Sequence, residues 1–550
     1  MPKIRVIPSG QEYEYKAGKN LLEILLDKKV FVDNPCNGKG TCGKCKIKIV
    51  SGNVAAPGET EERFLTKEEI ETGVRLSCLI IPEGDLEIEL LQKERQHKVL
   101  TKGYVPEFVF EPFVKEMVNE AERNEEGKQV YGVAVDIGTT TVACSLVNIY
   151  TGEEVAETSG INAQKHFGLD VLTRITYEIE HPENGKQELQ KALVDSLNEM
   201  IEELCCQSGV KKENIYEVVV AANCTMLHML LGVSAVSLGK APYMPVFTEA
   251  KNVKASEIGI HVAEEGRIYC LPSVSAYIGA DIVAGVYVCS LQKENGNVLF
   301  IDIGTNGEIV LANKGHLLCC SCAAGPALEG MNISSGMRAA NGAIEDITIT
   351  KEGIKLKVIG EEQPAGLCGS GILAVVKELL KTGVLKKDGA FVKINQLEEG
   401  NYCKEYLRPN GVKREFVITK EPKELLVTQS DIRQVQLAKG AILSGFIALL
   451  QKAGIQMNDL DKVMIAGQFG AHLPAESLVG IGVLPKEVKD KLVYVGNTSK
   501  IGAYMALMSF KAREEMEQLA KSMDYVELGA MEGYERLFIE CLSFPDNQNV

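Results

Sequence analysis

Long apolar runs, compositional bias and an excess of positive charge are all missing from this sequence, and each absence excludes a class of protein. No run of about twenty apolar residues occurs in the 550 residues, so we expect no membrane span. The N-terminus lacks the apolar core of a signal peptide, and we therefore expect a cytoplasmic protein. With 59 basic against 75 acidic residues the net charge is −16, which repels phosphate backbones and predicts no nucleic-acid partner. A composition of 45% hydrophobic and 24% charged residues is that of a folded globular chain.

Sixteen cysteines are few for a chain of this length, so disulfides are not expected and a tight cysteine cluster indicates a metal site. Three cysteines share one loop, Cys36, Cys42 and Cys45, and Cys78 follows. Zinc sites use paired Cys-x-x-Cys units, and this N-terminal cluster contains only one such unit. The first gap is five residues, against four in plant-type ferredoxins. This spacing resembles the adrenodoxin and putidaredoxin branch of ferredoxins and predicts a [2Fe–2S] cluster held by all four thiolates.

The segments around this loop predict a β-grasp ferredoxin domain over residues 1–92. The expected elements are strands at 3–8, 12–16, 46–50 and 85–90, and a helix at 21–29 capped by Asn20. Residues 93–128 are polar, contain prolines, and predict a linker. Its phenylalanines, in the string 105–113, are expected to dock on the rest of the chain.

A repeated string opens each half of the remaining sequence. Residues 132–138 read Gly-Val-Ala-Val-Asp-Ile-Gly and residues 298–304 read Val-Leu-Phe-Ile-Asp-Ile-Gly, and Thr follows both. In such a strand and turn, backbone N–H groups and hydroxyls bind phosphate oxygens while the carboxylate holds Mg²⁺ through water. We therefore expect Asp136 and Asp302 to organise Mg²⁺. The expected phosphate contacts are Gly138, Thr139, Thr140, Thr141, Gly304, Thr305, Asn306 and Gly307.

The two strings resemble the phosphate-1 and phosphate-2 motifs of the actin-like (ribonuclease H-like) ATPase superfamily. The resemblance implies a duplicated ATPase domain, with a first lobe at 129–296 and a second at 297–550. A late strand, 462–472, resembles the adenosine motif, with Gly467 and Gly470 allowing close approach of the nucleotide. Gln468 stands where that superfamily usually has a small residue. For activating the attacking water the candidates are Gln164, Asp281 and Glu308, unranked.

A [2Fe–2S] ferredoxin joined to an actin-like ATPase resembles the reductive activators of corrinoid-dependent methyltransferase systems over essentially the whole chain. Further matching strings are 162–174, 325–330, 336–339, 366–371 and 431–440. The resemblance implies ATP-dependent, one-electron reduction of cobalt(II) to cobalt(I) in a corrinoid protein, as in O-demethylation. The implied cofactors are the cluster, ATP and Mg²⁺. The implied partners are a corrinoid protein and a low-potential electron donor, and the family also contains homodimers.

Several alternatives stay open at this point. One alternative is a small-molecule kinase with an accessory ferredoxin. Another is an electron carrier with a vestigial nucleotide site. Cys319, Cys320 and Cys322 form either a second metal site or a set of buried thiols, and adjacency favours thiols because neighbouring side chains on a strand face opposite sides. His228 is expected to be a core histidine rather than a cobalt ligand. The loop 332–341 is expected to face the partner, with Arg338 either contacting it or pairing with Glu345.

Overall fold

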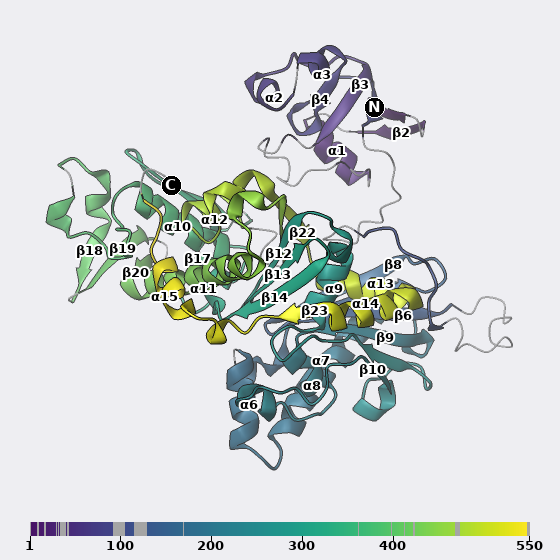
Figure 1. Ribbon diagram of the computed structural model, residues 1–550. Helices are drawn as coiled ribbons and strands as arrows, with labels where there is room; N and C mark the ends of the chain where they lie inside the picture. Colours follow the sequence, from purple (N-terminus) through teal and green to yellow (C-terminus); the bar gives the residue numbers. More distant parts are fainter. Residues whose placement is uncertain are drawn as a thin grey trace. The chain divides into compact units, whose positions relative to one another are not determined.

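The computed structural model describes most of the chain. The described residues are 2–7, 10–15, 18–28, 30, 32, 40, 43, 45–65, 67–91, 105–114, 129–168, 170–360, 362–397, 399–411, 413–421, 424–467 and 473–546. The chain divides into two compact units, Met1–His97 and Lys98–Val550, and each is treated by itself (Figure 1). Among the described residues, no helix has both the length and the apolar character that crossing a membrane requires.

The first unit is built on a five-stranded sheet in the order β2-β1-β5-β3-β4. Its elements are β1 (Lys3–Ile7), β2 (Gln11–Glu14), α1 (Leu21–Asp27), β3 (Lys46–Ser51), α2 (Glu59–Phe64), α3 (Lys67–Glu71), β4 (Val74–Leu76) and β5 (Leu86–Leu90). Strand β1 pairs antiparallel with β2 and parallel with β5, and its alternate residues Ile4 and Val6 are buried against α1 in one small core. The Asn20 side chain accepts a hydrogen bond from Glu23 N at 2.9 Å, which begins α1 as expected. The β-grasp ferredoxin fold is confirmed, with strand and helix ends within a few residues of those expected.

The second unit opens with a six-stranded sheet in the order β10-β11-β9-β6-β7-β8. Its strands are β6 (Tyr131–Ile137), β7 (Thr141–Asn148), β8 (Glu154–Ile161), β9 (Ile215–Ala222), β10 (Lys251–Lys254) and β11 (Arg267–Cys270). The helices are α6 (Val171–Glu180), α7 (Gly185–Ser208), α8 (Cys224–Leu230) and α9 (Ala280–Val288). Helix α7 packs against β7 and β8. Because helices also cover β6 and β9, apolar residues run consecutively along these strands instead of alternating.

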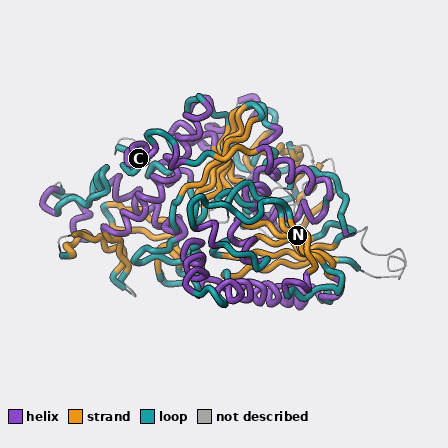
Figure 2. The backbone as a smooth tube through the Cα atoms, turned by 60° about the horizontal axis from the view of Figure 1, so that its bottom comes forward, coloured by secondary structure: helices purple, strands orange, loops and turns teal. Residues whose placement is uncertain are grey.

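A second six-stranded sheet follows, in the order β22-β21-β12-β13-β14-β23. Its strands are β12 (Asn297–Ile303), β13 (Gly307–Asn313), β14 (His316–Cys322), β21 (Lys462–Ala466), β22 (Leu492–Gly496) and β23 (Met523–Tyr525). Smaller sheets comprise β15 (Ala343–Thr350), β16 (Gly353–Val358) and β17 (Gly366–Leu367), and β18 (Leu407–Asn410), β19 (Lys413–Thr419) and β20 (Leu425–Thr428). The remaining helices are α10 (Gly369–Lys381), α11 (Gln429–Ala453), α12 (Ala475–Gly480), α13 (Thr498–Met508), α14 (Phe510–Ser522) and α15 (Tyr534–Cys541). Figure 2 shows the strands gathered into sheets with helices packed around them.

The duplication predicted from the repeated strings is visible in the topology. In the first sheet β6 pairs antiparallel with β7 and parallel with β9, and β7 pairs antiparallel with β8. In the second sheet β12 pairs antiparallel with β13 and parallel with β21, and β13 pairs antiparallel with β14. Each Asp-Ile-Gly string therefore ends the equivalent strand of its sheet, and the actin-like fold is confirmed.

The second sheet separates two hydrophobic cores. Val298 and Phe300 of β12 belong to the first core, whereas Leu299, Ile301 and Ile303 belong to the second. This is the two-residue period of a strand buried on both faces. The sheet is thus the common wall of the two cores.

The C-terminal part of the chain returns to the first core. Helices α13 and α14 lie between β22 and β23 of the second sheet in sequence, yet α13 packs against β6, β9 and α9. Their buried residues, Ile501 to Met508 and Met516 among them, lie in the first core. The division predicted at residue 297 assigns these helices to the second lobe. No local sequence pattern distinguishes a helix that packs on a distant sheet from one that packs nearby.

The described middle of the predicted linker is docked on these helices. Residues 105–113 are not helical, as the prolines predict, and the Phe113 ring stacks on Phe510 with centroids 5.9 Å apart. Phe108 contacts Tyr504 edge to face at 6.0 Å. Glu111 exchanges backbone hydrogen bonds of 2.9 and 2.8 Å with Met508 and Phe510. The expected docking through phenylalanines is confirmed for this segment.

Candidate functional site

Two of the four predicted cluster ligands lie side by side in the ferredoxin unit. Cys45 immediately precedes β3 and Cys78 follows β4, and because these strands are paired the two cysteines meet. Their sulfur atoms are 3.2 Å apart and both residues are buried. The hydrogen bond with Cys78 is the main cause that lowers the pKa of Cys45 to about 6. Cys36 and Cys42 lie outside the described residues.

The chemistry of this pair fits an iron–sulfur cluster, which takes thiolates rather than thiols. A buried ion pair fixes the strand that leads to Cys78. The Arg75 guanidinium donates to both carboxylate oxygens of Glu61, at 2.9 and 2.5 Å. Glu61 also accepts a hydrogen bond from Leu76 N at 2.9 Å. The position of Cys78 is thereby set before any metal binds.

In the second unit, each of the two Asp-Ile-Gly-Thr turns is closed by a backbone hydrogen bond from its glycine, which spans three residues in the first turn and two in the second. Gly138 N donates to Thr141 O at 2.9 Å in the first turn, and Gly304 N donates to Asn306 O at 2.9 Å in the second. Each turn follows the strand that carries its aspartate, Asp136 or Asp302. The turns therefore expose backbone groups in the arrangement expected of phosphate-binding hairpins.

Four carboxylates gather beside these turns. Asp136 and Asp302 come from the hairpins, Glu308 lies opposite Asp302 in the next strand, and Asp281 lies in the first turn of α9. All four residues keep some accessible surface, but their carboxyl groups lie among protein atoms, and this desolvation raises each pKa. The pKa rises to about 7 for Asp281 and about 8 for Asp302, with a further contribution from the neighbouring carboxylates. Such mutual repulsion is typical of a site that receives a cation.

The carboxylates do not form a ready-made metal cage. Within the part of the chain that the structure describes, no three His, Cys, Asp or Glu side chains converge closely enough to ligate a metal directly. Mg²⁺ usually keeps several waters and binds through one or two carboxylates together with nucleotide phosphates. The arrangement thus fits a hydrated Mg²⁺–nucleotide better than a free metal ion.

Asp136 also has hydrogen-bond partners that the sequence did not reveal. Asn497 Nδ2 and Ser499 Oγ each donate to its carboxylate at 2.8 Å, and Asn497 caps α13 by accepting from Lys500 N at 3.0 Å. Asp136 and Ser499 are 363 residues apart, so no local signal could have joined them.

Gln164 is not at this site. Its side chain is fully buried, its amide nitrogen donates to Leu189 O at 2.9 Å, and its amide oxygen accepts from Arg174 Nη1 at 3.1 Å. Arg174 also donates to the carbonyl of Thr139 at 2.5 Å. Gln164 therefore holds the arginine that supports the first phosphate turn, and both ends of its amide are occupied. An amide so placed does not activate water, so of the three candidates only Asp281 and Glu308 lie with the carboxylates.

The predicted adenosine motif ends beside Asp302. Gly467 follows β21 with a φ of +91°, and a Cβ atom there would lie 2.6 Å from Asp302 Oδ1. Only glycine tolerates both this conformation and this approach. Gln468 and Gly470, the other two residues expected to contact the nucleotide, lie outside the described residues.

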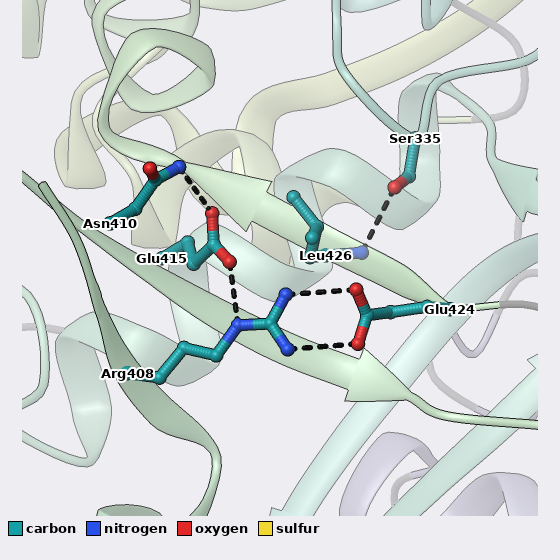
Figure 3. A network of polar contacts seen from close by, with 6 residues as sticks. All are labelled: Ser335, Arg408, Asn410, Glu415, Glu424 and Leu426. Atoms are coloured by element: carbon teal, nitrogen blue, oxygen red, sulfur yellow. Dashed lines mark hydrogen bonds and ion pairs between the residues drawn. The ribbon is translucent and has the colours of Figure 1, made fainter.

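The loop expected to face a partner is held from inside. Ser334 Oγ donates to Asp431 Oδ1 at 3.1 Å, and Ser335 Oγ accepts from Leu426 N at 2.9 Å. Figure 3 shows the second contact beside the network in which Arg408 pairs with Glu415 and Glu424. The two hydroxyls are thus engaged within the chain.

The pairing of Arg338 with Glu345 is not what the structure shows. The carboxylate of Glu345 lies 2.6 Å from Lys357 Nζ, its partner on the neighbouring strand. Arg338 acts instead on Glu329: burial raises the pKa of that carboxyl, and the positive charge of Arg338 opposes this rise.

The remaining alternatives for cysteine and histidine side chains are settled by burial. Cys319 lies in the first core, whereas Cys320 and Cys322 lie in the second, so the three thiols do not all lie on one face of β14. His228 is fully buried, with Nδ1 2.8 Å from Cys224 O and Nε2 accepting from Val246 N at 3.1 Å. Both of its ring nitrogens are satisfied. The expectation of buried thiols and of a core histidine is confirmed.

Comparisons with known proteins match each part of the chain. Residues 4–83 match the family model of the 2Fe-2S iron-sulfur cluster binding domain. Residues 131–294 match that of the RACo middle region, and residues 296–550 match that of the C-terminal domain of RACo, the ASKHA domain.

Curated relatives and a solved structure extend over most of the chain. The corrinoid activation enzyme RamQ of Eubacterium limosum is 29% identical over 93% of this chain and 94% of its own length. The Co(II) methylated amine-specific corrinoid protein reductase of Methanosarcina barkeri is 24% identical over 76% of this chain and 77% of its own. The structure of a reductive activator for corrinoid, iron-sulfur protein is 30% identical, covers 99% of both chains and superposes with a TM-score of 0.71.

Proposed function

Because the chain belongs to the RACo family, we propose that it reactivates a corrinoid protein by reducing its cobalt(II) to cobalt(I) in a reaction that consumes ATP. Cobalt gains one electron from the ferredoxin domain, and an external low-potential donor replaces that electron. ATP is hydrolysed to ADP and phosphate. The chain is thus an iron–sulfur oxidoreductase that uses ATP.

The need for ATP follows from the energetics of the electron transfer. Cobalt(I) is a strong reductant, so transfer to cobalt(II) from a ferredoxin cluster runs uphill. For a one-electron couple each ~59 mV is a factor of ten in the equilibrium constant. ATP supplies the missing free energy if its binding favours one conformation of the chain with its partner over another.

The roles of individual residues are part of this proposal. Cys36, Cys42, Cys45 and Cys78 hold the [2Fe–2S] cluster, which supplies a one-electron carrier when bound. The two hairpins bind the phosphates through the backbone of 138–141 and 304–307 and through the hydroxyls there. Asp136 and Asp302, helped by Asp281 and Glu308, hold the hydrated Mg²⁺ that accompanies the nucleotide.

The single observation that carries the proposal is that one chain combines both modules in intact form. In the ferredoxin domain the sulfur atoms of Cys45 and Cys78 lie 3.2 Å apart, which lowers the pKa of Cys45, and both phosphate hairpins keep their aspartates beside further carboxylates. A vestigial nucleotide site would not retain four interacting carboxylates at such an electrostatic cost. A sugar or acid kinase has no use for the thiol pair.

The direct test is the appearance of cobalt(I) in a corrinoid protein from the same organism. The holoprotein, a chemical low-potential donor and cobalt(II) corrinoid protein are mixed with and without ATP, and the visible spectrum of the corrinoid is followed. We expect cobalt(I) only when ATP is present. Equal reduction without ATP would contradict the role of ATP, and ATP turnover that responds to a small metabolite instead would favour a kinase.

The cluster assignment is tested with a matched pair of cysteine variants. Cys45→Ala is expected to remove the iron and the visible absorbance of the cluster while leaving nucleotide binding intact, because the two units have separate cores. Cys206→Ala replaces an exposed cysteine of α7 and should keep both. Full iron content in Cys45→Ala would refute the ligand set.

A further inference from the structure

Glu329 lies between the two phosphate hairpins. It ends the short 3₁₀ turn η7 (Pro326–Glu329), and only 2% of its surface is exposed. Thr305 Oγ1 donates to its Oε1 at 2.7 Å, and the Thr140 hydroxyl acts on the same carboxyl group by lowering its pKa. One carboxylate thus interacts with a hydroxyl from each hairpin.

The backbone that carries Glu329 is rigidly placed. A Cβ atom at Gly369 would lie 1.9 Å from Leu328 O, and one at Gly336 would lie 2.0 Å from Gly330 O. Both glycines therefore allow other segments to close on the backbone immediately before and after Glu329. A side chain mounted in this way keeps its position relative to the hairpins, as a group that acts on a reacting atom must.

One oxygen of this carboxylate is free. Oε2 is buried and has no hydrogen-bond partner among the described residues. A buried carboxylate oxygen without a donor is costly unless a ligand or water supplies one. Burial raises the pKa of Glu329, while the two threonine hydroxyls and the positive charge of Arg338 act against this rise and favour the ionised form.

The other candidates for accepting a proton are less suited. Gln164 is an amide with both ends bonded elsewhere. Asp281 and Glu308 belong to the repelling group of carboxylates, where desolvation and their neighbours favour the protonated form until a cation is present. With a cation present they serve to hold it. Glu329 is next to the phosphate turns but does not belong to that group.

We propose that Glu329 is the general base of ATP hydrolysis, with its free Oε2 directed at the attacking water and its Oε1 oriented by Thr305. The inference rests on the proposed function, since it requires ATP at the paired hairpins. The water oxygen bonds to the γ-phosphorus as its proton passes to Oε2. The bond from that phosphorus to the β,γ-bridging oxygen breaks, and the proton returns to solvent or to the released phosphate.

The test compares Glu329→Gln with Glu378→Gln in the full-length holoprotein. Glu378 is an equally buried glutamate on α10 whose Oε2 accepts from Ile349 N at 2.9 Å, away from the hairpins. We expect Glu329→Gln to slow phosphate release from ATP at least about 100-fold, while the affinity for a non-hydrolysable ATP analogue stays within about threefold. The residual activity of Glu329→Gln should also lack the decrease in rate that the wild type shows at acidic pH. Glu378→Gln should hydrolyse ATP at the wild-type rate.

Three outcomes would overturn the assignment. A Glu329→Gln variant that hydrolyses ATP normally has lost no base. One that binds the analogue more tightly and still hydrolyses ATP would mean that the carboxylate only occupies the place of a phosphate. If Glu329→Gln does not fold, Glu329→Asp decides, since withdrawing the carboxylate by one methylene should cost about tenfold or more in rate, and an unchanged rate refutes the proposal. Absence of hydrolysis in the wild type itself would instead refute the proposed function.

Discussion

The two phosphate hairpins share a sequence motif but differ in what surrounds their aspartates. Asp136 accepts hydrogen bonds from Asn497 and Ser499, at the start of a helix that packs on its own sheet. The carboxylate of Asp302 has no hydrogen-bond partner among the described residues, and its pKa rises to about 8. The same motif therefore gives one aspartate that is anchored and one that is left free and repelled.

The neighbouring strands explain the difference. Opposite Asp136 in β7 stands Ala143, whereas opposite Asp302 in β13 stands Glu308. Like charges directly opposite each other destabilise a strand pair. The second hairpin thus stores an electrostatic cost that binding of a cation would relieve, and the first hairpin joins the nucleotide site to α13.

The largest expected effect comes from removing the free aspartate. Asp302→Ala should lower ATP-dependent cobalt reduction at least about 100-fold, because charge stabilisation at a phosphoryl group is lost. Since no described side chain depends on Asp302 for a hydrogen bond, the fold should be intact. The measurement is the rate of cobalt(I) formation, with iron content and circular dichroism as checks on structure.

A control for this variant is Asp346→Asn. Asp346 lies on β15 in the same half of the chain and accepts a hydrogen bond from the adjacent Ile347 N at 2.9 Å. Its variant should retain the wild-type rate. A wild-type rate for Asp302→Ala would mean that the second hairpin does not organise the nucleotide, and the contrast between the hairpins would lose its functional meaning.

The second expected effect is on stability, where the two aspartates should behave in opposite ways. Removing Asp302 takes away a buried carboxylate with a raised pKa, so Asp302→Ala should be more stable than wild type by about 1–3 kcal/mol at pH 8. Removing Asp136 leaves the donors of Asn497 and Ser499 without an acceptor, so Asp136→Ala should lose about 1–2 kcal/mol at pH 5. Thermal unfolding of the metal-free protein at both pH values gives both numbers.

The pH dependence has a definite sign. In the unfolded chain Asp302 releases its proton near pH 4, and in the folded chain it does so near pH 8. Between these values the folded state binds more protons, so the wild type loses stability as the pH rises. The advantage of Asp302→Ala should therefore grow from pH 5 to pH 8, and a constant difference would contradict the raised pKa.

Much of this arrangement could be predicted from local sequence, and the rest depended on contacts between distant segments. The spacing of the cysteines and the repeated Asp-Ile-Gly strings predicted the ferredoxin fold and the paired sheets, because both are encoded in short strings. The partners of Asp136 lie more than 350 residues away from it, and the return of α13 to the first core has no local signature. The burial of Gln164 was not predictable, because polarity in a motif does not reveal whether a side chain points outward or supports a turn from behind. Glu329 lay in a matching string, but its position between two threonines required the fold.

A smaller effect is expected from the anchor of Asp136 itself. Ser499→Ala removes one of two donors to the carboxylate and leaves Asn497 in place, so the loss in stability should be about 1 kcal/mol. The shift should appear in the melting temperature of the second unit. Ser543→Ala offers a comparison, since its backbone carbonyl rather than its hydroxyl is used in the contact with Lys439. A loss as large as that of Asp136→Ala would mean that Ser499 alone carries the anchor.

The smallest expected effect concerns the residue that distinguishes the second hairpin. Burial, Asp281 and Asp302 raise the pKa of Glu308 well above its usual value, which favours the protonated carboxyl when no cation is bound. Glu308→Gln then replaces one neutral group by another of the same shape, and the amide can keep the contact with Ser321 Oγ. We expect the free energy of unfolding at pH 7 to change by less than about 0.5 kcal/mol. Above the raised pKa the wild type alone acquires a charge opposite Asp302, so the variant should become the more stable protein as the pH rises further. A clear gain in stability already at pH 6 would show that Glu308 is ionised in the folded chain, and the free state of Asp302 would then need another cause.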